Sequence, residues 1–276
     1  MFAGFMMNTW IVATMVATVA GFVGFFVVAR RSSFAAHVLP FAAFPGAAAA
    51  NLLGVSELLG LVVFAGLGVV GINQLGRNDR QEVATALCLV TLLALGTLFL
   101  SMTREYSQGI YALLFGEVLG ISTSQILPVA VMSVIALGTM ALCFRPLLLN
   151  SISPELAAAL GVSNRFWELQ FLTVLALSTA IALPVVGALL VFSLMVGPAS
   201  AARSLTNRPL VAALLSVGIA VVTVWVAIAL CYLSNWPVGF FVGALGVVSY
   251  LSGRLYRRYR ADSYRLSPRR LSSNDR

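Results

Sequence analysis

The feature that most constrains this chain is a series of long stretches that contain no Asp, Glu, Lys or Arg. They cover residues 1–29, 83–103, 118–144, 169–202 and 209–253. About 20 apolar residues in an α-helix are enough to cross the hydrocarbon core of a bilayer, so each stretch accommodates at least one crossing. Only 9% of the residues are charged, against about 25% in ordinary soluble domains. The sequence therefore predicts an all-α polytopic membrane protein and excludes a soluble enzyme.

The number of crossings follows from where the two longest stretches divide. Pro184 and Gly187 offer a break in one, and Ser234-Asn235-Trp236-Pro237 is a turn-rich tetrapeptide in the other. The expected spans are 3–29, 34–53, 58–75, 83–101, 124–144, 166–183, 187–202, 210–233 and 238–252. This gives about nine crossings, or about eight if one pair is merged, with 106–120 as a re-entrant or surface piece. Residues 1–253 form the expected transmembrane domain, and 254–276 an Arg-rich tail expected to be disordered.

The arginines indicate which way the chain crosses the membrane. All seventeen basic residues are Arg, and eight of them lie in the last 23 residues. If Arg30 and Arg31 are cytoplasmic, alternation of the spans places every other arginine except Arg104 on the same side, as the positive-inside rule requires. The N-terminus is then outside and the C-terminus cytoplasmic. The net charge of +8 is thus a topological signal toward the lipid bilayer, and we expect no nucleic-acid partner.

Proline and glycine occur inside the apolar stretches in two clusters. The first is Pro40, Pro45 and Gly46, and the second is Pro184, Gly187, Gly197 and Pro198. Broken helices near the middle of the membrane are typical of the substrate paths of transporters. Close packing of small residues between helices is the alternative explanation. Because both clusters lie beside ionisable or hydroxyl groups, we expect helix breaks along a transport path.

Few ionisable side chains lie within the apolar stretches. His37, the only histidine, follows Arg31 by six residues. A neutral imidazole there is a candidate ligand for a transition metal, or else an interfacial residue. Glu57 and Glu117 are expected near the external face, where they attract cations, contact another protein, or lie at solvated helix ends. These three residues form the candidate metal or substrate path.

The loop 145–165 carries the most structured local signal. Its defining residues are Ser153, Pro154, Glu155 and Gly161, which suit the N-cap, the first helical position, the positive end of the helix dipole and the left-handed C-terminal cap. The sequence predicts a short helix over 154–160, with Ala157, Ala158 and Ala159 exposed on it. Such a helix either rests on the membrane or inserts into a groove of a cytoplasmic partner.

Several short motifs stand in a fixed order along the chain. Besides Ser153–Gly161, which is similar to D-P-E-L-A-x-A-x-G, they are Arg30-Arg31 with Phe34 (R-R-x-x-F), Phe44-Pro45-Gly46 (L-P-G), Leu114-Phe115-Gly116 (L-F-G), Val185–Val191 (V-V-G-x-L-L-V), and Pro198-Ala199 with Ala202-Arg203 (P-A-x-x-A-R). In these motifs the chain resembles the permease subunits of zinc/manganese/iron-type ABC transporters. The resemblance covers nearly the whole sequence.

The resemblance implies a homodimeric permease that moves a divalent transition metal inward by alternating access. It implies an extracytoplasmic substrate-binding protein, two cytoplasmic ABC ATPase subunits docked on Pro154–Leu160, and a bacterial plasma membrane. The sequence contains no phosphate-binding Gly-rich loop. We therefore expect no enzyme activity and no cofactor in this chain, with ATP and magnesium bound to the ATPase partner.

One departure from the family pattern bears on the substrate. Before L-P-G, such permeases usually carry F-x-G-D-A-x-S-H, whose Asp and His are thought to bind the passing metal. Here His37 stands in place of the Asp, Pro40 in place of the Ser, and Phe41 in place of the His. A phenyl ring cannot coordinate a metal. Two alternatives remain: a permease for a metal chelate or another small solute, and a membrane scaffold subunit without a substrate path.

Overall fold

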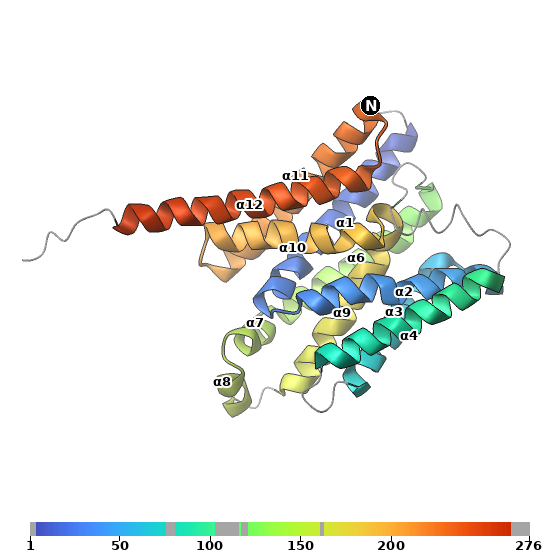
Figure 1. The fold of residues 1–276 in the computed structure, drawn as a ribbon, viewed down its shortest axis with the longest axis horizontal. Helices are drawn as coiled ribbons and strands as arrows, with labels where there is room; N and C mark the ends of the chain where they lie inside the picture. Colours follow the sequence, from blue (N-terminus) through green and yellow to red (C-terminus); the bar gives the residue numbers. More distant parts are fainter. Residues whose placement is uncertain (1–3, 76–80, 103–115, 117–120, 161–162, 266–276) are drawn as a thin grey trace, which may run out of the picture.

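The computed structural model describes residues 4–75, 81–102, 116, 121–160 and 163–265, and every regular element among them is a helix (Figure 1). The helices are α1 (Gly4–Ala29), α2 (Ser33–Leu53), α3 (Glu57–Leu75), α4 (Gln81–Met102), α6 (Thr123–Leu142), α7 (Phe144–Ile152), α8 (Pro154–Ala159), α9 (Asn164–Val186), α10 (Ala188–Leu205), α11 (Pro209–Ser234) and α12 (Val238–Arg265).

Eight of these helices are long and apolar enough to cross a membrane: α1, α2, α3, α4, α6, α9, α11 and α12. The apolar part of α10 is shorter, at Leu190–Leu205. The predicted all-α fold with eight or nine crossings is confirmed. The piece expected over 106–120 lies outside the described residues, apart from Gly116.

The helix ends coincide with residues that favour the left-handed backbone conformation. Gly54 follows α2 with a φ of 68°, and the N–H of Val55 donates to the carbonyl of Ala50 at 3.0 Å, which satisfies one of the last carbonyls of α2. Gly187, with a φ of 85°, separates α9 from α10. Asn235, with a φ of 57°, ends α11. The sequence analysis predicted helix boundaries at Gly187 and Asn235.

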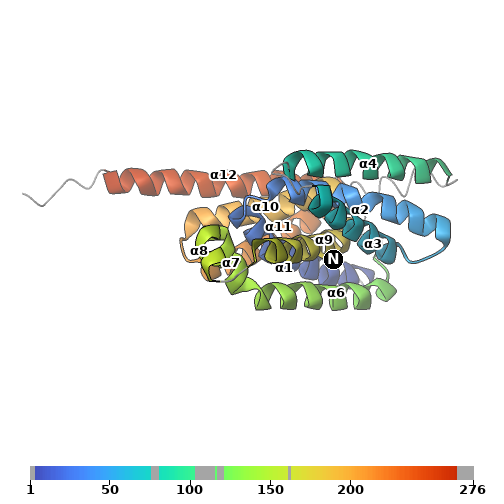
Figure 2. The same ribbon diagram turned by 90° about the horizontal axis from the view of Figure 1, so that it is seen from below.

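Four helices form the centre of the bundle. Most side chains of α1, α2, α9 and α10 are buried, and Figure 2 shows α4 and α12 on one side of them and α6 on the other. The outer helices expose large apolar side chains such as Leu98, Leu127 and Val247. An apolar exterior around a closely packed interior is what a helical bundle in lipid requires.

The helix break expected at Pro45 and Gly46 is absent, because α2 runs without interruption through both residues. α10 likewise continues through Pro198, and α9 continues past Pro184 to its last residue. Gly46 packs against Gly60 of α3 so closely that a Cβ on either residue would overlap the carbonyl oxygen of the other. In lipid a helix satisfies its own backbone, and neighbouring helices support it at a proline. Close packing of small residues between α2 and α3 therefore explains the presence of Gly46.

α12 continues to Arg265, where the sequence predicted a disordered tail beginning at residue 254. Figures 1 and 2 both show the C-terminal part of α12 projecting beyond the bundle. Arg and Leu favour helices, and extending an existing helix needs no new nucleus. The extension exposes Arg254, Leu255 and Arg257. Residues 266–276 lie outside the described residues.

Candidate functional site

His37 lies in the second turn of α2 and is exposed on the surface of the single chain. Its ring contacts two phenyl rings edge to face. The ring of Phe41, one turn further along α2, has its centroid 5.4 Å away at an interplanar angle of 67°. The ring of Phe192 on α10 lies at 5.3 Å and 79°. Edge-to-face contacts of this kind are favourable, so two aromatic residues hold the imidazole in place on the surface.

The structure places Glu57, another candidate path residue, far from His37. Glu57 begins α3 and is exposed. It follows the far end of α2, which lies about 24 Å along the helix from His37 at about 1.5 Å per residue. Glu117 lies outside the described residues. No group of three or more His, Cys, Asp or Glu able to hold a metal occurs among the residues the structure describes.

The backbone near His37 supplies a further possible ligand. Proline has no N–H group, so Pro45 leaves the carbonyl of Phe41 without its usual partner four residues ahead in the helix. The ring of Pro45 is covered by α4, where a Cβ on Gly96 would come within 3.2 Å of it. The Phe41 carbonyl lies more than one turn further along α2 than the imidazole, because helix side chains lean toward the N-terminus and carbonyls point toward the C-terminus. Both atom types coordinate divalent metals.

Gly116 links two of the sequence motifs in space. A Cβ at this position would approach the carbonyl oxygen of Val185 at 2.6 Å and the carbonyl carbon of Val186 at 2.6 Å, and its φ is 80°. Only glycine fits at a positive φ so close to the backbone of another segment of the same chain. Gly116, the last residue of the L-F-G motif, therefore meets the end of α9, directly beside the break at Gly187.

The short helix predicted over 154–160 is present as α8, Pro154–Ala159, and it starts at the expected proline. The N–H of Leu156 donates to Ser153 Oγ at 3.4 Å, so Ser153 caps the helix as predicted. Glu155 lies in the first turn, at the positive end of the dipole. Gly161, the predicted C-terminal cap, lies outside the described residues.

The surface of α8 differs from the expected exposed row of alanines. Ala157 is completely buried, since α8 packs against α7 and α9, whereas Ala159 is exposed. The side chain of Ala158 lies outside the described ones. The large exposed apolar side chains are Leu156 and Leu160. Figure 1 shows α7 and α8 at one end of the bundle, beyond the spans.

Sequence reasoning did not identify Phe192 as part of the site around His37. It lies in the uniformly apolar stretch that forms α10, where nothing distinguishes it from a lipid-facing or core residue. Only the packing of α10 against α2 places its ring beside the imidazole. A contact between residues 155 positions apart (192 − 37) leaves no local signal.

Known proteins similar to this chain are membrane components of transport systems. It is 28% identical over 207 residues to the manganese transport system membrane protein MntC of Listeria innocua, covering 74% of each chain. It is 27% identical over 249 residues to the manganese import system permease protein ScaB of Streptococcus parasanguinis, covering 90% of this chain and 89% of the relative.

The fold agrees with these similarities. A solved structure, PsaBC from Streptococcus pneumoniae in complex with Fab, superposes with a TM-score of 0.86 at 24% identity, covering 95% of this chain and 96% of that one. The description of the ABC 3 transport family matches residues 3–256, which is almost the whole bundle, α1 to α12. The chain therefore belongs to the ABC 3 transport family.

Proposed function

We propose that this chain is the permease subunit of an ATP-driven importer of divalent transition-metal ions in a bacterial plasma membrane. The observation that carries the proposal is the family match over residues 3–256. Relatives whose names specify manganese import align over as much as 96% of the chain. The eight candidate spans agree with a permease, and ATP with magnesium binds to a separate ATPase.

The substrate path runs past His37, between two copies of the permease. The imidazole is exposed on an otherwise apolar helix, and a polar group facing lipid is costly. A second copy related by a two-fold axis presents the same patch to this one. Each copy then contributes one imidazole, and water completes the coordination of the metal.

These ligands suit some metals better than others. Imidazole nitrogen favours zinc and iron, whereas manganese prefers carboxylate oxygen. His37 replaces the aspartate expected at its position, and Phe41 supplies no side-chain ligand. We therefore assign zinc or iron as the preferred ion, with manganese carried less well. This preference distinguishes the chain from the manganese permeases that it resembles.

Coupling to ATP hydrolysis takes place at α8. The exposed side chains of Leu156 and Leu160, with Glu155 beside them, form an apolar surface with one charge, suited to a groove in each of two ATPase subunits. The buried Ala157 fixes α8 on α7 and α9. A displacement of α8 by the ATPase would therefore also displace α9, a central helix.

The arginines support an orientation with the N-terminus outside and the C-terminus cytoplasmic. Arg30 follows α1, Arg203 lies in the last turn of α10, and Arg254 lies in the C-terminal half of α12. A side chain from the end of α10 reaches the end of α1, since Arg203 Nη1 donates to the carbonyl of Val28 at 3.0 Å. The opposite, outer end receives the metal from a substrate-binding protein.

Replacing His37 with Ala is expected to reduce metal uptake about 10–100-fold, the usual scale for altering the ligand environment of a metal. The measurement is ATP-dependent uptake of labelled zinc, iron and manganese into proteoliposomes that contain the complete transporter. Thr91→Ala is the control, because Thr91 is exposed on α4 and its hydroxyl bonds only within that helix, to Leu87 O at 2.9 Å.

Three outcomes separate this proposal from its alternatives. Wild-type uptake by His37→Ala would exclude His37 as a ligand. Absence of uptake for all three metals in the wild type would favour a metal chelate or another small solute as the substrate. A chain that neither transports a solute nor binds an ATPase would be a membrane scaffold.

Unlike His37→Ala, the variant His37→Asp is expected to keep metal uptake and to shift its preference toward manganese. The substitution supplies the hard oxygen ligand that manganese prefers and removes the nitrogen that zinc prefers. The zinc-to-manganese uptake ratio should fall by about tenfold, which corresponds to about 1.4 kcal/mol in relative affinity. Competition between the two ions in the same proteoliposomes measures this ratio directly. An unchanged ratio would show that residue 37 does not select the ion.

A further inference from the structure

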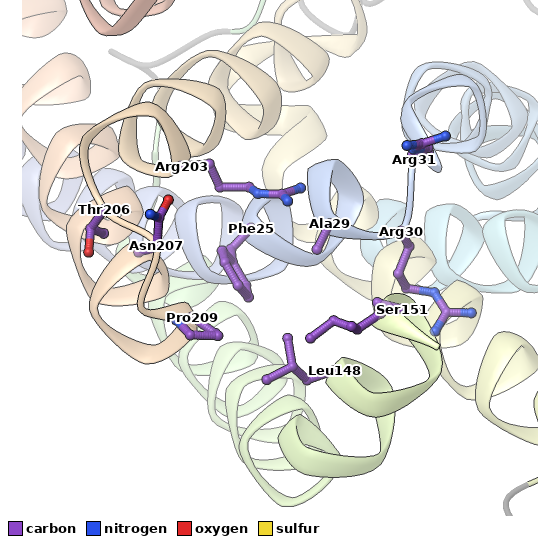
Figure 3. A pocket seen from close by; sticks show the side chains of 12 residues that line it. Phe25, Ala29, Arg30, Arg31, Leu148, Ser151, Arg203, Thr206, Asn207 and Pro209 are labelled. Carbon is purple, nitrogen blue, oxygen red and sulfur yellow. The ribbon is translucent and has the colours of Figure 1, made fainter. Parts of the chain in front are cut away.

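A cavity of about 600 Å³ lies where α1 ends and α11 begins. It is open on one side and is lined by the end of α1, by α7 and by the turn between α10 and α11 (Figure 3). Phe25, Leu148 and Ala212 give it an apolar part, while Ser151, Thr206 and Asn207 add hydroxyl and amide groups. Neither His37 nor α8 takes part, so this cavity is separate from the proposed path and coupling site.

Positive charge dominates the lining of the cavity. Arg30, Arg31 and Arg203 all line it, and none of the described lining residues is acidic. Figure 3 shows Arg203 on one side of Ala29 and Arg30 on the other, with Arg31 further out toward α2. The guanidinium of Arg203 favours an anion with several oxygens, while that of Arg30 lies against Phe171 of α9.

The two inner arginines retain unused hydrogen-bond donors. Arg203 Nη1 donates a hydrogen bond to the carbonyl of Val28, and its guanidinium carries further N–H donors. Arg30 Nε and Nη1 are buried and have no hydrogen-bond partner among the described residues, although the guanidinium lies over the ring of Phe171 at 5.1 Å. Buried charged donors without partners are costly. An anion in the cavity would remove this cost if the guanidinium turned from Phe171 toward it.

The burial of Arg30 and the N-terminus of α11 also affect the electrostatics of this cavity. Burial lowers the pKa of Arg30, and the nearby negative charge of Glu168 raises it, so Glu168 offsets only part of the cost of burying this guanidinium. Pro209, the first residue of α11, also lines the cavity. The N-cap residue Arg208 makes no side-chain cap, and the positive end of the α11 dipole therefore adds to the attraction.

We propose that this cavity binds a phosphate group between Arg30 and Arg203. Phosphate oxygens can accept from both arginines at once, which a planar carboxylate does less well. The group has two possible sources: the phosphodiester of an anionic phospholipid, whose glycerol and acyl parts would contact Phe25 and Leu148, or free inorganic phosphate. Either ligand joins α1, α7 and the α10–α11 turn.

The test uses the complete purified transporter and native mass spectrometry with phosphatidylglycerol as the probe. Wild type is expected to retain one lipid per permease chain. Arg203→Gln should weaken retention about tenfold, since a charge-assisted hydrogen bond is lost, and Arg30→Gln with Arg203→Gln should abolish it. Arg254→Gln, which removes the same charge from an exposed site on α12, should retain lipid as wild type does. The single variant keeps the test valid if the double variant does not fold.

Adding inorganic phosphate distinguishes the two sources. Lipid that remains bound at millimolar phosphate identifies the phospholipid, and saturable phosphate binding that displaces it identifies the free ion; either result supports the site when Arg203→Gln weakens it. Equal retention by wild type, Arg203→Gln and Arg254→Gln would overturn the proposal. So would the absence of binding by both probes. Neither result bears on metal uptake, which is measured separately.

Discussion

A permease with Leu156→Asp and Leu160→Asp is expected to lose its ATPase subunits and with them all ATP-driven uptake. The two leucines are 52% and 65% exposed in the single chain. Moving each leucine side chain into a groove contributes about 1.5–3 kcal/mol, and an aspartate in the same groove is buried without a partner. The association should weaken about 100-fold or more, at about 1.4 kcal/mol per factor of ten.

Co-purification of the ATPase with a tagged permease measures this association, and the thermal stability of the permease alone reports on its fold. The folded permease should be unaffected because both side chains are exposed. Leu53→Asp is the matched control, since Leu53 is 76% exposed at the end of α2, away from α8. Normal co-purification by the double variant would show that the ATPase docks elsewhere. Loss of association in the Leu53 variant would show a nonspecific effect of the charge.

Local signals were sufficient to predict α8 and most spans. A helix in lipid needs a run of apolar residues of sufficient length, and that property is visible in any short window of sequence. The N-cap at Ser153 and the proline that starts α8 act within one turn, so the prediction is correct to within a residue. The break at Gly187 follows equally from one residue that tolerates a positive φ.

Where the sequence misled, the deciding contacts lie far along the chain. Pro45 and Gly46 resemble a helix break, yet α3 and α4 pack on them and α2 stays continuous. Ala157 belongs to a row of small residues, and only the positions of α7 and α9 determine that it is buried. The aromatic pair around His37 depends on Phe192 in the same way. Such outcomes depend on tertiary packing, which a single sequence does not display.

Gly60→Ala is expected to destabilise the packing of α2 against α3. In α3 the added Cβ would overlap the carbonyl oxygen of Gly46 and come within 2.7 Å of the Cβ of Ala50. Backbone atoms cannot move aside as a flexible side chain can, so α2 and α3 must separate. Overpacking of this kind costs about 1–3 kcal/mol, which lowers the melting temperature of a chain of this size by about 2–12 °C.

Gly66→Ala provides the matched control, because Gly66 lies on the same helix and a Cβ there meets nothing within 4 Å. In that variant the helix should become slightly more stable, by up to about 1 kcal/mol, because alanine loses less backbone entropy than glycine. Thermal unfolding of the detergent-solubilised permease, followed by loss of the monodisperse species, compares the two. Equal melting temperatures for both variants would mean that α2 and α3 do not meet at Gly46 and Gly60. His37 would then lack the rigid α2 that holds it against Phe192, and the assignment of the path to this face would lose its structural basis.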